Sequence, residues 1–157
     1  DVNQVLSDTP LLFSKENGAK QLPFSLNSYL LIIDTGVVGI TKYTVEHVKE
    51  NLKTYKPYID ELGNITKKVI KPLKEKNIDL IGEYMYKAHS LLQKIGVSHE
   101  KNDEVVELCK NNNAKGAKLT GGGAGGCCIC LCDTKENALK IQDELKEKGY
   151  LSWMVTV

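Results

Sequence analysis

The sequence predicts an α+β domain in which helices pack on an antiparallel sheet. A continuous apolar run at 29–34 is typical of a fully buried strand. Apolar residues recur at helical spacing through the middle of the chain. The C-terminal part alternates strand, glycine-rich loop, strand, helix and strand. The length of 157 residues suits one domain with a core of its own better than two domains.

The elements follow from these patterns in order along the chain. Leu11–Phe13 is a brief apolar run that ends at the turn signal 14–18. After the strand at 29–34 and a loop at 35–40, helices are predicted at 41–53 and 59–75, then from Asp79 to 95 and from Ser98 onward, with both named residues as N-caps. The polar run 111–113, a strand at 127–132, a helix at 135–148 and a strand at 151–157 complete the order.

The segment between Thr120 and Cys127 is the most unusual, because it holds five glycines and one alanine. Glycine loses more backbone entropy than other residues on folding, so such a cluster implies unusual φ values or a close approach of the backbone to another group. Several backbone N–H groups would suit an anion, and a wide turn or the packing of two backbones are the alternatives. The loop is no P-loop, because Cys127 and Cys128 stand where Lys and Ser or Thr are required. The strand-like sequence after it also excludes a Rossmann fingerprint.

Charge and composition limit the classes of molecule that we expect this chain to bind. The 21 basic residues, all of them lysines, almost balance 20 acidic residues, so neither nucleic acid nor an acidic membrane surface is predicted as a partner. Without arginine, a bound anion would meet ammonium groups and not a guanidinium fork. No apolar run is long enough to cross a bilayer, and the first residues show no secretory signal.

Four of the five cysteines crowd into 127–132 in a C-C-x-C-x-C pattern. This spacing lacks the paired C-x-x-C units of a structural zinc site. On a strand, Cys128, Cys130 and Cys132 would share one face, with Ile129 and Leu131 on the other. We interpret the cysteines as small apolar residues of a buried strand in a reducing compartment, which predicts a cytoplasmic protein with no metal site in this chain.

Three motifs in order resemble the mevalonate kinase branch of the GHMP small-molecule kinases. The run 118–127 is similar to K-L-T-G-A-G-G-G-G-C, and 31–35 followed by Thr41 and Lys42 is similar to the family's N-T-x-x-x-x-x-T-[KR]. The corner 95–99 with Asp103 is similar to L-G-V-[SG]-H-x-x-x-D. The resemblance covers nearly the whole chain. It implies the ferredoxin-like C-terminal domain of these kinases over 29–157, with 1–28 as a remnant of the N-terminal lobe.

The resemblance also implies an activity. These kinases use ATP and Mg²⁺, bound mainly by an N-terminal lobe whose P-x-x-x-G-[LI]-G-S-[SA]-A loop does not occur here. The implied reaction phosphorylates the primary hydroxyl of mevalonate or of a related small carboxylate alcohol, and the chain alone is expected to be inactive. Expected partners are the N-terminal lobe and a second copy in a homodimer. The alternatives are phosphomevalonate kinase, diphosphomevalonate decarboxylase and, from another class, a non-catalytic small-anion-binding module.

Individual residues take roles from the same resemblance. Asp1 matches the catalytic aspartate of a P-S-G-x-D segment, unless it is only a boundary residue. Thr41 matches a threonine that orients this carboxylate, or else it caps the helix that follows. The substrate and phosphate loop consists of Thr120, Gly121, Gly122, Gly123, Ala124, Gly125 and Gly126.

Three positions are read differently or depart from the family pattern. Gly39 stands where mevalonate kinases often carry an arginine associated with the substrate carboxylate, although Lys42 offers a point charge nearby. Asn102 replaces a residue that is usually apolar in the corner motif, which predicts an altered helix start. His99 is interpreted as a packing or capping residue and not as a general base.

Overall fold

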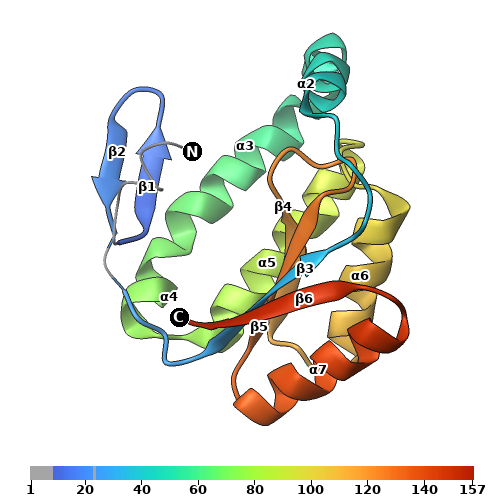
Figure 1. Cartoon of the computed structure of the whole chain (residues 1–157). Helices are drawn as coiled ribbons and strands as arrows, with labels where there is room; N and C mark the ends of the chain where they lie inside the picture. Colours follow the sequence, from blue (N-terminus) through green and yellow to red (C-terminus); the bar gives the residue numbers. More distant parts are fainter. Residues whose placement is uncertain (1–8, 23) are drawn as a thin grey trace.

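The computed structural model describes residues 9–22 and 24–157. Its body is a four-stranded antiparallel sheet in the order β4-β5-β3-β6, with helices packed against it (Figure 1). The strands are β3 (Tyr29–Asp34), β4 (Gly116–Thr120), β5 (Cys127–Cys132) and β6 (Leu151–Thr156). The predicted α+β class is therefore confirmed.

The helices lie between β3 and β4 and between β5 and β6. They are α2 (Thr41–Glu50), α3 (Leu52–Lys68), α4 (Ile70–Glu75), α5 (Ile78–Lys94), α6 (Glu100–Asn111) and α7 (Lys135–Glu147). Helices α6 and α7 pack on the sheet, α5 packs along β4, and α3 and α4 pack on α5. Helix α2 projects beyond one end of the sheet (Figure 1).

The core lies between the sheet and helices α6 and α7. Leu31 and Ile33 of β3 meet Val105 of α6 and Ile141 of α7 there, and all four are fully buried. Cys128, Cys130 and Cys132 line the same face at 0 % exposure, which confirms the predicted alternation along β5. Burial raises the pKa of Cys128 to about 11, so this thiol is protonated and packs as a small apolar group.

Helix boundaries differ from the predicted ones for local reasons. The predicted helix 59–75 begins earlier and divides at Val69, which places Pro72 in the first turn of α4, where a missing N–H costs little. The N-caps are Ile40, Asn77 and His99, and not Thr41, Asp79 and Ser98. The side chains of Asn77 and His99 accept hydrogen bonds from backbone N–H groups, whereas Ile40 has no capping side chain.

Residues 9–22 form a hairpin apart from the main sheet. β1 (Leu11–Ser14) pairs with β2 (Gly18–Gln21) across a turn, so the apolar run at 11–13 is a strand. Figure 1 shows the hairpin beside α3, away from the four-stranded sheet. The polar sequence of β2, exposed along its length, has no alternation that could have predicted it.

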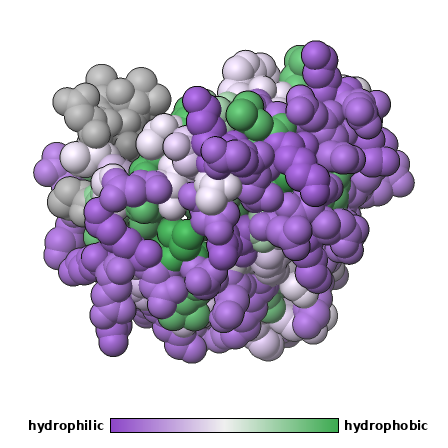
Figure 2. Space-filling model, turned by 90° about the horizontal axis from the view of Figure 1, so that it is seen from below, coloured by the Kyte–Doolittle hydropathy of each residue, from purple (hydrophilic) through white to green (hydrophobic). Residues whose placement is uncertain are grey.

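The surface seen from below is mainly hydrophilic, with apolar side chains in small areas between polar ones (Figure 2). In the described residues, no helix combines the length and the apolar character needed to cross a membrane.

Candidate active site at the glycine loop

Three loops meet at one end of the sheet (Figure 1). They are the loop 35–40 between β3 and α2, the corner 95–99 between α5 and α6, and the glycine loop 121–126 between β4 and β5. Each belongs to one of the three motifs that were recognised separately in the sequence. The fold therefore brings residues from distant parts of the chain into a single site.

Thr35 joins the first loop to the glycine loop. Its backbone N–H and its hydroxyl both donate to the carbonyl of Gly126, at 3.0 and 2.6 Å. In return, the N–H of Gly126 donates to the carbonyl of Val37 at 2.7 Å. Two loops more than ninety residues apart are thus held as closely as two paired strands.

The glycines are required by close packing of the three loops. A Cβ on Gly123 would lie 2.2 Å from the carbonyl oxygen of Val97, and one on Gly39 would lie 2.6 Å from that of Gly123. A Cβ on Gly122 would lie 2.7 Å from the hydroxyl of Thr41. Gly123 also has a φ of +80°, which side chains disfavour. The close approach inferred from the sequence is, in large part, an approach to neighbouring backbone.

Backbone hydrogen bonds divide the glycine loop into two halves. In the second half, the N–H groups of Ala124, Gly125 and Gly126 donate to Val97, Asn102 and Val37. In the first half, the N–H groups of Gly121, Gly122 and Gly123 have no acceptor among the described residues. Gly121 and Gly122 are also exposed. Only the first half of the loop can therefore offer N–H groups to an anion.

Thr41 lies next to this first half. It is the first residue of α2 and is exposed. Its hydroxyl packs against Gly122, at the position that a side chain on this glycine would occupy. A cavity of about 390 Å³ lies nearby, lined by Val38, Ile40 and Ala124 together with Lys42, Tyr43 and Glu46 of α2. Thr41 and the loop from Thr120 to Gly126, predicted as site residues, are thus together. Asp1 lies outside the described residues.

Position 39 leaves no room for the arginine that, by the resemblance, mevalonate kinases often carry here. The hydrogens of Gly39 face the carbonyl oxygen of Gly123, so any side chain there would displace the glycine loop. The glycine at position 39 therefore removes a positive charge and also allows the glycine loop to lie close to the loop 35–40. Lys42 remains as an exposed ammonium, 4.0 Å from the carboxylate of Glu46.

The site contains a residue whose function the sequence did not indicate. Asn102 of α6 is fully buried, and its amide binds both the N–H and the carbonyl of Gly125, each at 3.0 Å. The sequence showed only a polar residue at a position that the corner motif usually fills with an apolar one. Its partner lies 23 residues away, so no local pattern could identify it.

A polar cluster lies behind the glycine loop. The imidazole Nε2 of His89 is 3.1 Å from the carboxylate of Asp103, which also accepts the Ser98 hydroxyl. Burial lowers the pKa of His89, and the nearby Asp103 carboxylate opposes this only in part. Burial also lowers the pKa of Lys118, whose ammonium donates to the carbonyl of Leu119.

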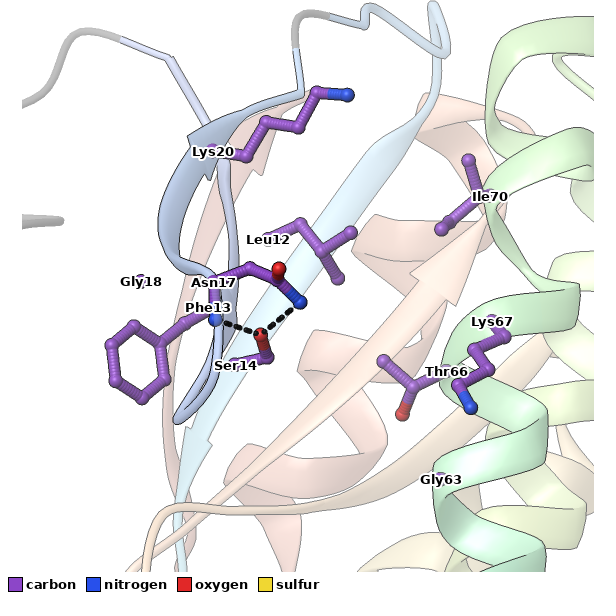
Figure 3. A pocket seen from close by; sticks show the side chains of 10 residues that line it. All are labelled: Leu12, Phe13, Ser14, Asn17, Gly18, Lys20, Gly63, Thr66, Lys67 and Ile70. Carbon is purple, nitrogen blue, oxygen red and sulfur yellow. Dashed lines mark hydrogen bonds between the residues drawn. The ribbon is translucent and has the colours of Figure 1, made fainter.

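A second cavity lies away from this site. It has about 640 Å³ and lies between the β1–β2 hairpin, which contributes Leu12 and Asn17, and the helices α3 and α4, which contribute Thr66 and Ile70 (Figure 3). None of the predicted site residues lines it. Within the described ranges, no group of three His, Cys, Asp or Glu side chains is placed to hold a metal ion.

Comparison with known proteins shows the family of this chain. The family model described as "GHMP kinases C terminal" matches residues 69–151, more than half of the chain. The chain belongs to the GHMP kinases. A mevalonate kinase of Pyrococcus abyssi is 34% identical over 134 residues, which cover 80% of this GHMP kinase chain and 40% of the relative.

Solved structures give the same result. The crystal structure of L. major mevalonate kinase in complex with R-mevalonate has a TM-score of 0.84 and 26% identity, covering 93% of this GHMP kinase chain and 48% of that one. The phosphomevalonate kinase of Streptococcus pneumoniae, in complex with phosphomevalonate and AMPPNP, shares the fold at a TM-score of 0.77 and 17% identity, over 89% of this chain and 43% of that one. The chain is mevalonate kinase-like and spans less than half the length of these proteins.

Proposed function

We propose that this chain forms the C-terminal side of the active-site cleft in an ATP-dependent kinase that phosphorylates the primary hydroxyl of mevalonate. The observation that carries the proposal is that Thr41 lies against Gly122, in the half of the glycine loop whose N–H groups have no acceptor among the described residues. The similarity to mevalonate kinases over most of the chain supports the choice of substrate. The other side of the cleft would be an N-terminal lobe, which the matched proteins have the length to contain.

Each group of the site has a part in this proposal. The exposed N–H groups of Gly121 and Gly122 would donate to phosphate oxygens, where negative charge concentrates during phosphoryl transfer. The Thr41 hydroxyl would orient the carboxylate of Asp1, which would accept the proton of the substrate hydroxyl. Mg²⁺, when bound, supplies charge neutralisation between phosphate oxygens, and we assign its ligands to the N-terminal lobe. The homodimer and the cytoplasmic location stay predictions.

A coupled assay of ADP release tests the proposal with the chain alone and with the two-lobed enzyme, in which the chain is supplied with an N-terminal lobe. We expect turnover of mevalonate only in the two-lobed enzyme. Asp1→Asn in that enzyme should lower kcat by about 100-fold or more, because the proton acceptor is lost. Robust turnover by the chain alone would contradict the proposed division between two lobes.

A second candidate function is supported by Gly39. Because this position lacks the arginine associated with the substrate carboxylate, the main alternative to mevalonate is a substrate that carries a phosphate in addition to the carboxylate. A comparison of kcat/KM for mevalonate, phosphomevalonate and diphosphomevalonate in the two-lobed enzyme separates mevalonate kinase from phosphomevalonate kinase and diphosphomevalonate decarboxylase. A rise in Tm of the isolated chain with inorganic phosphate, without any turnover in the two-lobed enzyme, would instead favour the small-anion-binding module.

A further inference from the structure

The side chain of Asn102 is buried between α6, β5 and the glycine loop at 0 % exposure. Its Oδ1 accepts from the N–H of Gly125 at 3.0 Å and from that of His99 at 3.1 Å. Its Nδ2 donates to the carbonyl of Gly125 at 3.0 Å and approaches the sulfur of Cys128 at 3.4 Å. A neutral amide offers two donors and two acceptor positions, so this side chain has no hydrogen-bonding capacity left over.

The paired hydrogen bonds to Gly125 restrain the loop in a way that a single contact could not. They hold both polar groups of one residue, and so fix its position as well as its rotation. Gly125 has a φ of +113° and Gly126 a φ of +66°, values that a flexible glycine segment would exchange for many others. Asn102 thus restricts the backbone of the glycine loop, which is the segment of the chain with the greatest intrinsic backbone freedom.

The restraint acts beside the half of the loop that has free donors. Val97, Asn102 and Val37 each hold one of the three residues from Ala124 to Gly126. The segment Gly121–Gly123 is joined directly to this restrained region, so the restrained residues determine where the segment lies. Thr41 stays in contact with Gly122 only while the segment keeps this position.

We propose that Asn102 is a positioning residue for phosphoryl transfer: its amide fixes Gly125 so that Gly122 stays beside Thr41 and the N–H groups of Gly121 and Gly122 keep their orientation. The expected effect of Asn102 on phosphoryl transfer rests on the proposed function. The restraint that Asn102 places on the glycine loop does not, and it can be measured in this chain alone. A misplacement of about 1 Å in a catalytic group can lower a rate by about 100-fold, so a buried residue that touches no substrate can still control kcat.

Two variants and one control test the proposal. Asn102→Leu keeps the branched shape of the side chain and removes all four hydrogen bonds, whereas Asn102→Asp keeps the two acceptor contacts and loses both donor contacts, to the Gly125 carbonyl and the Cys128 sulfur. Val105→Ala, one turn along α6 and equally buried, destabilises the core without touching the glycine loop and is the matched control.

The first measurement is amide hydrogen exchange on the 157-residue chain. In Asn102→Leu we expect the protection of the Gly125 N–H to fall by about tenfold or more relative to amides of β5, since a buried hydrogen bond is lost. In Val105→Ala the amides of the loop and of β5 should lose protection together. Equal protection ratios in Asn102→Leu and the unchanged chain would overturn the inference, whatever the enzyme does.

The second measurement is steady-state kinetics in the two-lobed enzyme. Asn102→Leu should lower kcat by about tenfold to 100-fold with KM changed less than threefold, Asn102→Asp should fall between, and Val105→Ala should keep kcat. An unchanged kcat in Asn102→Leu would overturn the catalytic role. Failure of the unchanged two-lobed enzyme to phosphorylate any of the substrates would instead refute the proposed function, and the exchange result would still decide whether Asn102 fixes the loop.

Discussion

The imidazole of His89 is buried between β4 and α6, with Leu119 at one ring nitrogen and Asp103 at the other. The backbone N–H of Leu119 donates to its Nδ1 at 3.3 Å, so the proton of the neutral ring belongs on Nε2, which faces Asp103 at 3.1 Å. A second proton on Nδ1 would oppose the N–H of Leu119 directly. This geometry and the 4 % exposure of the residue explain why burial lowers the His89 pKa despite the carboxylate nearby.

The stability of the chain should therefore depend on pH through His89. The ordinary pKa of histidine is 6.5, and the folded chain holds His89 below it, so the unfolded chain binds more protons as the pH falls. The contribution is complete above about pH 6.5 and decreases as the pH falls from there toward the lowered pKa. Urea unfolding at pH 8, 6.5 and 5 should show a steeper loss for the unchanged chain than for His89→Gln. Parallel profiles for the two proteins would contradict this assignment.

At the residue scale, the sequence predicted side chains that act on near neighbours and missed those that act over distance. His99 was interpreted as a packing or capping residue and does cap α6, in place of the predicted Ser98, because its partner Lys101 lies two residues away. Asn102 and His89 have partners 23 and 30 residues away, and those contacts exist only after α5, α6 and the sheet have packed. The glycine cluster could be recognised, but which of its N–H groups remain free could not.

The packing of α5 on β4 depends on two facing glycines. A Cβ on Gly82 would lie 1.9 Å from the carbonyl oxygen of Lys115, and a Cβ on Gly116 would lie 2.5 Å from the Cα of Gly82. No other residue type allows the helix and the strand to approach so closely. This contact also explains why a glycine stands in β4 although glycine has low strand propensity: a side chain on Gly116 would collide with the backbone of α5.

Gly82→Ala should therefore destabilise the chain strongly although alanine favours helices. Separating α5 from β4 is a case of overpacking, for which about 1–3 kcal/mol is typical. Gly63→Ala on α3 is the matched control, since nothing lies within 4 Å of its added Cβ, and it should stabilise by about 0.5–1 kcal/mol. Urea unfolding followed by circular dichroism measures both. Equal stability of the two variants would show that α5 can move away from β4 at no cost.

Other elements could be predicted where their own sequence carries the signal, and could not where they depend on a distant partner. β3 and β5 have continuous apolar sequences and were placed at their observed limits. β2 has the sequence Gly-Ala-Lys-Gln with every residue exposed, and forms only because β1 is there to pair with it. The division between α3 and α4 at Val69 has no sequence signal apart from Pro72, and nothing in the structure explains the toleration of Pro57 inside α3.

At the scale of the whole molecule, fold class and family followed from the order of motifs, whereas the division of the chain at 28 and 29 remains untested. The structure gives reason to place the limit of the main body earlier. Leu26 is 8 % exposed and packs with Ile81 and Leu131, and the N–H of Ser28 donates to the carbonyl of Val157. The β1–β2 hairpin, by contrast, lies across a cavity of about 640 Å³ from α3.

Two truncated chains test where the body begins. A chain starting at Leu22 loses the hairpin, whose strands pair with each other, so its Tm should stay within about 2 °C of the original. A chain starting at Tyr29 also loses Leu26, and burial of a leucine stabilises by about 1.5–3 kcal/mol, so its Tm should fall by about 3–12 °C. Calorimetry of the three chains at one concentration measures both effects. A Tm for the shorter chain equal to that of the longer would place the limit at Tyr29, and an equal fall in both would mean that the hairpin stabilises the body across the cavity.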